Sequence, residues 1–286
     1  MTMKLGILTD FSEERIRLAG TVGFDCVSIL ADPRNKAGKL IATQGGRQKI
    51  LETCQKYNVE IRAITAYRLY IDPNPKVRRD AAAWFRTVVK AACEMGVSVI
   101  PALTGRDPSK SIEESIPQFQ KIWTPLAQFA EDHGVKVAFE NWPGGWDINH
   151  GINIAVCPKA WRLMFDAVPS KALGLEFDPS HLYWQQIDFV RAVHEFGSRI
   201  YHVHLKDTEI LKDNLYETGI TRGSFRFRIP GWGEIDWPAF FTALVEIRYR
   251  GGMVIEHEDP VFSGKDFDEG FRLGYRFLKP LIPQLV

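Results

Sequence analysis

The chain has 286 residues, of which 45% are hydrophobic and 25% are charged, as in ordinary globular proteins. Its formal net charge of +1 gives no general attraction to nucleic acid or to an anionic membrane. No apolar run is long enough to cross a bilayer, and residues 1–10 have the pattern of a strand, not of a signal peptide. The four cysteines are scattered, which argues against a disulfide framework and suits a reducing compartment. We therefore expect a soluble, cytoplasmic protein that binds neither nucleic acid nor membrane.

One unit recurs along the chain: a helix ends at a glycine or an asparagine, and an apolar strand comes directly after it. Four such helix ends are Gly23, Asn58, Gly96 and Gly134, which lie 35, 38 and 38 residues apart. Both residue types tolerate the left-handed conformation that often ends a helix. The pattern predicts strands over residues 4–9, 25–30, 59–65, 97–103, 135–140, 173–177, 200–205 and 253–256. It predicts helices from Ser12 to about Gly23 and over residues 43–57, 77–95, 111–132, 158–168, 187–196, 237–249 and 267–281.

Strands that alternate with helices indicate βα units and a parallel sheet. Eight strands, each followed by a helix or helical segment, favour a closed (β/α)8 TIM barrel over an open doubly wound sheet. The Rossmann fingerprint is missing, because Gly231-Trp-Gly233 lacks the third glycine and follows no strand. Barrels of this length commonly form one domain. We expect residues 1–286 to form a single-domain, α/β TIM barrel with a long loop insertion at 207–235.

Side chains that can bind a metal stand at the ends of four consecutive predicted strands: Glu140, Asp178, His204 and Glu256. Chemistry in TIM barrels takes place at the carboxyl ends of the strands. Three carboxylates and one imidazole suit a single divalent cation, and we expect Mn²⁺ first, with Mg²⁺, Co²⁺, Fe²⁺ or Zn²⁺ as alternatives. The alternative is a set of ion pairs between strand ends. This alternative is disfavoured because none of the four strand-end residues is a lysine or arginine that could neutralise the acids.

Two of these residues could also perform proton transfer. A 2-hydroxy ketone can chelate a divalent ion, which polarises its carbonyl and acidifies the neighbouring C–H. Because Glu140 and Glu256 come from the fifth and eighth strands, we expect them to approach the chelated carbon from opposite sides as a catalytic pair. Epimerisation, aldose–ketose isomerisation and elimination all pass through an enediolate, and the sequence does not choose among them.

Three further polar residues share the strand faces of the predicted ligands. Glu176 and His202 lie two residues before Asp178 and His204, and we expect a buried Glu–His hydrogen bond that supports the ligands. Lys206 lies one step beyond His204 on the same face, where it could orient Asp178 or contact the substrate.

Aromatic side chains fall on the loops after the fifth and sixth strands. They include Trp142, Trp146 and Trp184, and His150 lies beside them. An aromatic face such as that of Trp142 can stack on sugar C–H bonds and bind substrate, although a loop tryptophan is as often a lid or a subunit contact.

Five short runs surround the predicted site: Phe139-Glu-Asn141, Asp178-Pro-Ser-His181, His202-Val-His-Leu-Lys-Asp207, Pro230-Gly-Trp-Gly-Glu-Ile-Asp-Trp237 and Ile255-Glu-His-Glu-Asp259. With these runs the chain resembles the xylose-isomerase-like TIM barrels, also called the sugar phosphate isomerase/epimerase family. Relatives in that family include ketose 3-epimerases, inosose-processing enzymes and endonuclease IV. The resemblance covers essentially the whole chain. It implies that Glu140, Asp178, His204 and Glu256 are the metal ligands and that His181 contacts substrate.

The chain departs from the family at one substrate position. Where the epimerases carry a substrate-binding arginine shortly after the strand-seven histidine, this chain has Asp207-Thr-Glu209. Arg226 or Arg228 in the insertion could fold back to replace it. We therefore expect residues 225–230 to lie over the metal pocket and to set substrate choice.

The sequence thus predicts a divalent-metal-dependent carbohydrate isomerase or epimerase that acts on a sugar or keto-sugar. A lyase acting on a keto-sugar or 3-keto-glycoside is the alternative. A phosphodiesterase like endonuclease IV is disfavoured, because its metal cluster needs extra histidines where this chain has Ala66-Tyr-Arg68 and Thr104-Gly-Arg106. A non-catalytic sugar-binding barrel has no need of acids on two sides of a metal. The exact sugar, its phosphorylation state and the formation of a homo-oligomer stay open.

Overall fold

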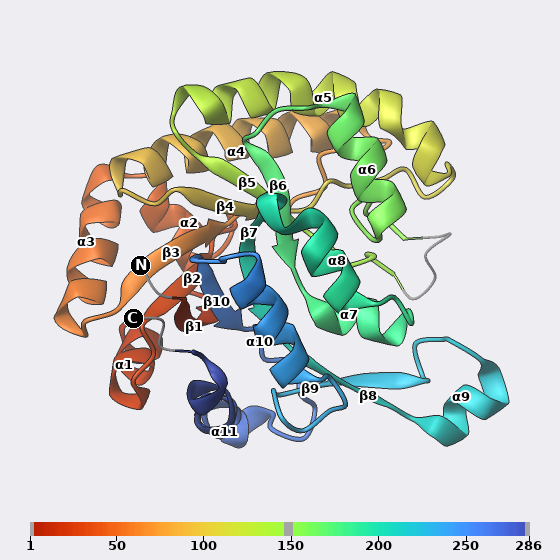
Figure 1. Cartoon of the computed structure of the whole chain (residues 1–286). Coiled ribbons are helices and arrows are strands. Elements are labelled where there is room, and N and C mark those ends of the chain that lie inside the picture. The colour runs from red at the N-terminus through yellow and green to blue at the C-terminus, as the bar shows by residue number, and fades with distance from the viewer. Residues whose placement is uncertain (1–2, 146–150, 284–286) are drawn as a thin grey trace.

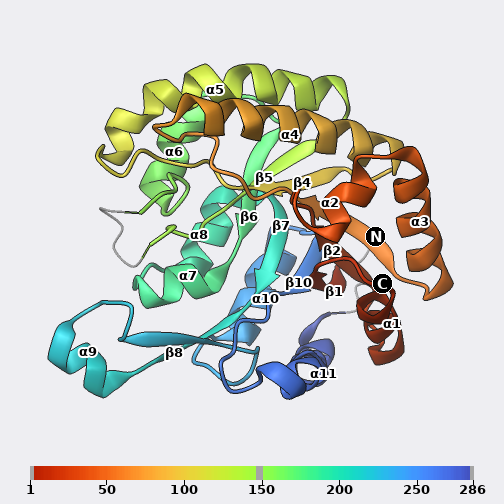
Figure 2. The same cartoon turned by 180° about the vertical axis from the view of Figure 1, so that it is seen from behind.

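The computed structural model describes residues 3–145 and 151–283. Eight parallel strands form a nearly closed ring with helices around its outside (Figures 1 and 2). Its strands are β1 (Lys4–Thr9), β2 (Cys26–Leu30), β3 (Glu60–Thr65), β4 (Val99–Ala102), β5 (Lys136–Glu140), β6 (Leu173–Phe177), β7 (Ile200–Leu205) and β10 (Gly252–Ile255). Neighbours are arranged in the order β3-β2-β1-β10-β7-β6-β5-β4. The open seam is bridged where the Ala66 N–H donates to the Pro101 carbonyl (2.8 Å). The TIM barrel predicted from the sequence is confirmed.

The helices begin and end where local chemistry favours it. They are α1 (Glu13–Val22), α2 (Lys36–Ile41), α3 (Gln44–Lys56), α4 (Pro75–Glu94), α5 (Ile112–Asp132), α6 (Pro158–Ala167), α7 (Pro179–Trp184), α8 (Phe189–Phe196), α9 (Lys212–Thr218), α10 (Trp237–Glu246) and α11 (Phe267–Leu278). Short 3₁₀ turns cover Gly197–Arg199, Gly264–Asp266 and Lys279–Leu281. Ser111 and Glu114 form a capping box at the start of α5. Gly96 and Gly134 have φ of 70° and 67°, so the left-handed helix ends predicted from the sequence are present.

Two parts of the chain are more ordered than the sequence indicates. The short helices α2 and α7 are absent from the prediction, because six residues are too few to show a helical repeat. The insertion expected as a loop contains an antiparallel hairpin, in which β8 (Asp207–Ile210) pairs with β9 (Phe225–Arg228). Helix α9 joins the two strands and projects away from the barrel in both views (Figures 1 and 2).

The core between strands and helices fixes which side chains face the barrel interior. Trp123 in α5 packs edge-on against Phe139 in β5, with ring centroids 4.6 Å apart. Because side chains alternate along a strand, Glu140 then faces the opposite way, into the mouth of the barrel. The same alternation places Glu176 and His202, partners in the parallel pairing of β6 and β7, on the interior face.

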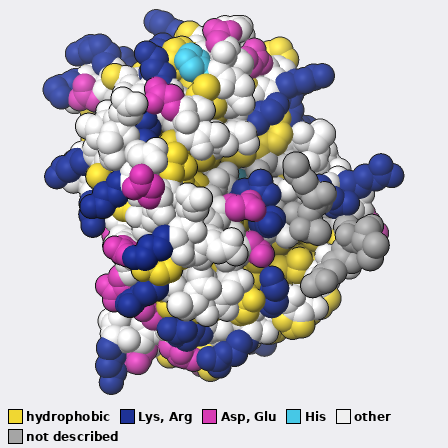
Figure 3. Space-filling view, turned by 90° about the vertical axis from the view of Figure 1, so that its left-hand side faces the viewer, with side chains coloured by type: hydrophobic (Ala, Val, Ile, Leu, Met, Phe, Trp, Pro, Cys, Tyr) yellow, Lys and Arg dark blue, Asp and Glu magenta, His cyan; other side chains and the backbone are white. Residues whose placement is uncertain are grey.

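The space-filling view shows one face of the molecule (Figure 3). On the face shown in Figure 3, acidic and basic side chains are interspersed, in keeping with the formal net charge of +1. Among the residues that the structure describes, no helix is long and apolar enough to span a membrane.

Candidate metal centre and active site

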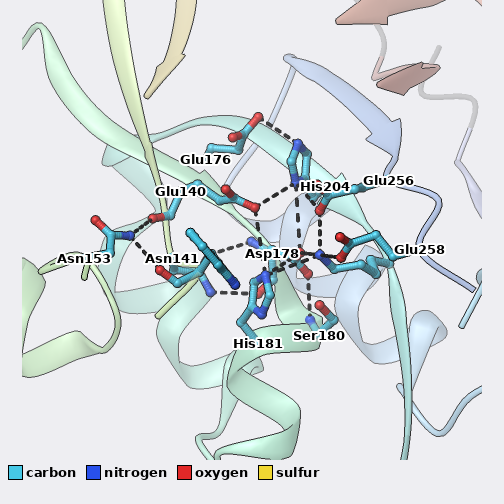
Figure 4. A network of polar contacts seen from close by, with 12 residues as sticks. Glu140, Asn141, Asn153, Glu176, Asp178, Ser180, His181, His204, Glu256 and Glu258 are labelled. Carbon is cyan, nitrogen blue, oxygen red and sulfur yellow. Dashed lines mark hydrogen bonds and ion pairs between the residues drawn. The ribbon is translucent and has the colours of Figure 1, made fainter. Parts of the chain in front are cut away.

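Carboxylates and imidazoles meet inside the mouth of the barrel, and the labelled side chains of Glu140, His204 and Glu256 point toward one another (Figure 4). Glu140 ends β5, while Asp178 and Glu256 directly follow β6 and β10. One potential ligand atom from each of Glu140, Asp178, Glu256 and His181 lies within 4.8 Å of the others. Since β10, β7, β6 and β5 are successive neighbours in the ring, their carboxyl ends bring these groups together.

His204 lies between two levels of acidic side chains. Its Nδ1 is 3.1 Å from Glu256 Oε2, 3.5 Å from Glu140 Oε1 and 4.0 Å from Asp178 Oδ2. Its Nε2 is 2.9 Å from Glu176 Oε1. Burial alone would lower the pKa of His204, but Glu176 and Glu256 raise it well above its usual value. The acids thus stabilise the ring as a cation. In the neutral ring, the proton lies on Nε2, toward Glu176, and the lone pair of Nδ1 faces the other acids.

Glu176 forms the lower level of the cluster. Its Oε1 also lies 3.1 Å from His202 Nδ1, and its Oε2 accepts a hydrogen bond from the Tyr67 hydroxyl. Burial would raise the pKa of Glu176, but His204 and His202 outweigh it and lower that pKa to about 2. Glu176 is therefore an ionised carboxylate that accepts a hydrogen bond from Tyr67 and lies at ion-pair distance from two imidazoles. Sequence reasoning missed Tyr67, because it lies in the loop after β3 with no metal-ligand type beside it.

Lys206 supplies a cation that is not counted in the sequence-based prediction. Its Nζ is 2.5 Å from Glu256 Oε2, 2.9 Å from Glu258 Oε2 and 3.2 Å from Asp178 Oδ2. The expectation that no strand-end lysine or arginine neutralises the acids is therefore wrong, because Lys206 directly follows β7 and turns into the cluster. Burial would lower the pKa of Lys206, but Glu256, Glu258 and Asp178 raise it well above its usual value. Sequence reasoning assigned no role to Glu258, which lies at the rim.

The cluster nevertheless fits a divalent cation. Burial, together with Glu256, raises the pKa of Glu140 to about 8, which means that one more positive charge would be stabilised there. Within the described part of the chain, Asp178 Oδ2 and His204 Nδ1 are buried and have no hydrogen-bond partner of regular geometry. Carboxylate oxygens and an imidazole nitrogen are the ligands that Mn²⁺ and similar ions accept. Glu140, Asp178, His204 and Glu256 could hold such an ion.

His181 is a second imidazole at the same site. Its Nε2 lies 3.4 Å from Asp178 Oδ2 and 3.3 Å from Lys206 Nζ. Burial, with Lys206 second, lowers the pKa of His181 well below its usual value, so the ring is neutral. A neutral imidazole beside an ammonium group can accept one hydrogen bond and donate another, as binding of a substrate hydroxyl requires.

The hairpin of the insertion covers one side of this site with an aromatic ring. Phe227 in β9 meets the edge of the His181 ring, with centroids 5.2 Å apart. The Lys206 Nζ lies 4.4 Å from the centroid of the Phe227 ring, within cation–π range. Trp184 stacks on Phe225 at 4.6 Å and fastens the hairpin to α7.

The predicted substrate residues of the insertion are engaged elsewhere. Arg226 and Arg228 alternate with Phe227 along β9, which places them on the other face of the strand. Arg226 Nε donates to Glu209 (2.8 Å), while Arg228 Nε donates to Asp259 (2.8 Å). Their assignment as substrate contacts stays a prediction.

The loop tryptophans are placed in part. Trp142 is half-buried beyond β5, and its carbonyl accepts a hydrogen bond from Asn153 (2.7 Å). A role of Trp142 in binding substrate stays a prediction. Trp146 and His150 lie outside the described residues.

The run from Pro230 to Trp237 is folded around the carboxylate of Asp207. Asp207 Oδ1 accepts from the N–H of Thr208 (2.9 Å) and of Ile235 (3.0 Å). Its Oδ2 accepts from the N–H of Gly231 (2.9 Å) and from Trp237 Nε1 (2.9 Å).

Both glycines of this run are required by the structure, Gly233 by its close approach to Asp207 and Gly231 by its backbone conformation. A Cβ at Gly233 would lie 2.3 Å from Asp207 Oδ1, and Gly231 has φ of 90°. The contacts with Asp207 therefore explain why the chain carries this run, which is one of the five runs that carry the family resemblance.

The chain matches a known protein family over most of its length. A sequence model described as xylose isomerase-like TIM barrel matches residues 16–281, which confirms the resemblance drawn from the sequence. Over 143 residues the chain is 31% identical to inosose dehydratase of Salmonella typhimurium (strain LT2), a match that covers 47% of this chain and 44% of that enzyme. The chain thus matches less than half the length of that relative.

Two solved structures share the fold across the whole chain. One is 3-keto-D-glucoside 4-epimerase, YcjR, from E. coli, with a TM-score of 0.73, 18% identity, and coverage of 97% of this chain and 99% of that one. The other is IolI with a zinc atom bound, with a TM-score of 0.76, 19% identity, and coverage of 98% of both chains.

Replacing Asp207 should destabilise the fold much more than replacing a surface helix cap. Asp207→Ala leaves four donors without their acceptor, three of them on buried groups, and should lower the free energy of unfolding by about 3–5 kcal/mol. Asp188→Ala removes only the cap to Arg191 N–H and should cost about 1 kcal/mol. Urea denaturation monitored by tryptophan fluorescence measures both. Equal losses in the two variants would contradict the role given to Asp207.

Proposed function

Because the chain belongs to the family of xylose isomerase-like TIM barrels, we propose that it is a divalent-metal-dependent enzyme that isomerises or epimerises a sugar or keto-sugar. The observation that carries this proposal is the buried cluster in which Glu140, Asp178 and Glu256 surround His204 Nδ1. The likeness to a 3-keto-glucoside epimerase and to a zinc-containing structure of the same fold supports it. A cytoplasmic location is part of the proposal, and the four unpaired cysteines support it.

We assign Glu140, Asp178, His204 and Glu256 as the metal ligands and Mn²⁺ as the expected ion. A divalent cation bound there supplies a Lewis acid that polarises a substrate carbonyl and acidifies the adjacent C–H. His204 is preferred over His181 as the nitrogen ligand, because Glu176 holds His204 Nε2 and leaves Nδ1 toward the carboxylates.

Glu140 and Glu256 are assigned as the proton-transferring pair. They stand at the carboxyl ends of β5 and β10, with β6 and β7 between them, so their carboxylates reach the centre of the site from two sides. One takes the proton from the carbon next to the carbonyl, and the other returns a proton from the opposite side. His181 and Lys206 lie within 3.3 Å of each other beside this pair and are placed to hold a substrate hydroxyl or oxyanion.

Elimination is the second candidate activity. The 31% identity to an inosose dehydratase favours it, because a dehydratase starts with the same removal of a proton next to a carbonyl. The two reactions differ only in the second step, which is either loss of a hydroxyl from the neighbouring carbon or return of the proton.

The test of both is solvent exchange. The Mn²⁺-loaded protein is incubated in D₂O with ketoses, 3-keto-glucosides and inososes, and products are identified by NMR and mass spectrometry. Deuterium at the carbon next to the carbonyl in an intact sugar supports isomerisation or epimerisation. Loss of water with an unsaturated product supports elimination. A protein that exchanges and transforms none of these substrates would overturn the proposed function.

Metal binding should depend on the buried acids and not on acids in general. Calorimetric titration of chelator-treated protein with Mn²⁺ should give one site per chain. Asp178→Asn keeps the cap on Ser180 N–H but removes the charge, and it should weaken binding by at least about 100-fold, since even outer-shell changes cost roughly 10–100-fold. Glu246→Gln, which removes a surface carboxylate 3.4 Å from His194, should leave binding unchanged. Failure of the wild type to bind any divalent ion would contradict the assignment.

Glu140→Gln and Glu256→Gln should each abolish turnover while metal content falls much less. An amide keeps an oxygen for the ion but cannot take the proton, and proton transfer by a placed side chain is worth about 10²–10⁴ in rate. One of the two variants should still exchange the substrate C–H with deuterium, because it retains the glutamate that starts the reaction.

The matched control for this pair is Glu195→Gln, which removes a surface carboxylate 2.6 Å from Arg162 and should keep full activity. Full activity in either Glu140→Gln or Glu256→Gln would point to His181 or Lys206 as the base instead.

Phe227 should matter more for substrate binding than the arginines beside it. Phe227→Ala removes the ring that covers His181 and Lys206, and it should raise KM by about 10-fold, equivalent to about 1.4 kcal/mol. Arg226→Ala breaks only the pair with Glu209 and should change KM less. Steady-state kinetics with the substrate identified by solvent exchange measure both. A larger effect of Arg226→Ala would restore the arginine as the substrate contact.

A further inference from the structure

A tyrosine from the far side of the ring reaches the lower level of the site. Tyr67 lies just beyond β3, and its hydroxyl donates a hydrogen bond to Glu176 Oε2, on β6. Along the ring, β4 and β5 separate β3 from β6, so the side chain spans the interior of the barrel and does not join neighbouring strands. Nothing in the fold itself requires a phenol to end on this carboxylate, which is fully buried.

The bond from Tyr67 fixes the one oxygen of Glu176 that no histidine holds. Oε1 faces both His202 Nδ1 (3.1 Å) and His204 Nε2 (2.9 Å). A carboxylate held at one oxygen only can rotate about its last bond, and its distance to two rings then varies. The hydrogen bond from Tyr67 to Oε2 limits this rotation and keeps Oε1 directed at His204 Nε2.

The orientation of His204 depends on that contact. A carboxylate on Nε2 keeps the proton on that nitrogen and turns Nδ1 toward Glu140 and Glu256, at 3.5 Å and 3.1 Å. A neutral phenol is needed for this, because a phenolate could not donate to a carboxylate. Burial, with Glu140 and Glu176 next, raises the pKa of Tyr67 well above its usual value, so the hydroxyl keeps its proton.

We propose that Tyr67 is a positioning residue for the metal centre: its hydroxyl holds Glu176, and Glu176 holds His204 in the tautomer and orientation that bind the ion. This inference rests on the proposed function, because it assigns a residue to the same metal site. It adds a residue from the loop after β3 to a site whose ligands come from the ends of four other strands.

A second tyrosine on the same turn provides the matched control. Tyr70 lies three residues on, is fully buried, and its hydroxyl donates to the Ala66 carbonyl (3.2 Å). Its ring packs against Trp123 and Phe85 in the layer between strands and helices, at 4.7 Å and 5.8 Å. Tyr67→Phe and Tyr70→Phe therefore each remove one buried hydroxyl bond beside β3, but only the first bond leads to His204.

The experiment compares metal binding by the full chain and by these two variants. Calorimetric titration with Mn²⁺ gives affinities, and the visible absorption of the Co²⁺-loaded protein reports ligand geometry. Tyr67→Phe should weaken Mn²⁺ binding by about 10-fold or more and change the Co²⁺ spectrum, as loss of an outer-shell partner does. Tyr70→Phe should change neither, even where it lowers the melting temperature as much. Equal affinity and an unchanged spectrum in Tyr67→Phe would overturn the inference.

A double-mutant cycle tests whether Tyr67 acts through Glu176. In a Glu176→Gln background, the further change Tyr67→Phe should cost little additional affinity, because the link to His204 is already altered. A full additional loss there would mean that Tyr67 acts on the ion directly, and the inference would be wrong. A wild type that binds no ion overturns the proposed function itself, whereas a wild type that binds and a Tyr67→Phe variant that binds equally overturn only the role of Tyr67.

Discussion

The barrel must compensate four carboxylates that it gathers at one end: Glu140, Glu176, Asp178 and Glu256. Removing a charge from water costs several kcal/mol unless a partner of opposite charge and hydrogen bonds replace the solvent. Strand β7 and the residue directly after it supply those partners. His204 lies between Glu176 and Glu256, and Lys206 lies between Asp178 and Glu256. Because β7 stands between β6 and β10 in the ring, one strand serves acids on both sides. The run His202-Val-His-Leu-Lys206 therefore balances the charge of the buried acids, and a group that carries positive charge is favoured at the centre of the cluster.

The alternation of side chains along β7 arranges these positive and polar groups in successive levels along the barrel axis. His202, His204 and Lys206 share the interior face because side chains alternate, while Val203 and Leu205 are fully buried toward the helices. At the bottom, His202 and Glu176 are sealed from solvent. At the top, Lys206 meets Glu258, whose side chain is 49% exposed. Polar groups thus pass from a closed layer to an open rim within one strand. In the proposed function, substrate binds at the upper level, and the lower level orients the groups that lie above it.

The sequence predicted the barrel because its signals are local: apolar runs preceded by Asn58, Gly96 and Gly134, each with positive φ. It also predicted which strand ends carry acids, since parallel strands bring their carboxyl ends together. What it could not predict comes from contacts across the ring. Tyr67 approaches Glu176 from a distant loop, and the neutralising position of Lys206 depends on how the chain turns after β7. Side-chain alternation along the hairpin can be predicted from the sequence, but not which face of the hairpin lies on the site, where Phe227 contacts His181 and Lys206.

The hairpin shows how the chain can depart from its family at one residue and keep the site intact. Asp207 stands where related epimerases are expected to carry a substrate-binding arginine, and its carboxylate instead holds the run from Gly231 to Trp237. That anchoring sets the path of the chain that returns from β9. The Arg228 guanidinium, paired with Asp259 and Glu209, secures the outer face of the same strand. The inner face then offers Phe227, a ring with no charge, to His181 and Lys206. Within the described residues, the hairpin thus contributes an uncharged ring to the site, whereas the charged groups of the site come from the barrel.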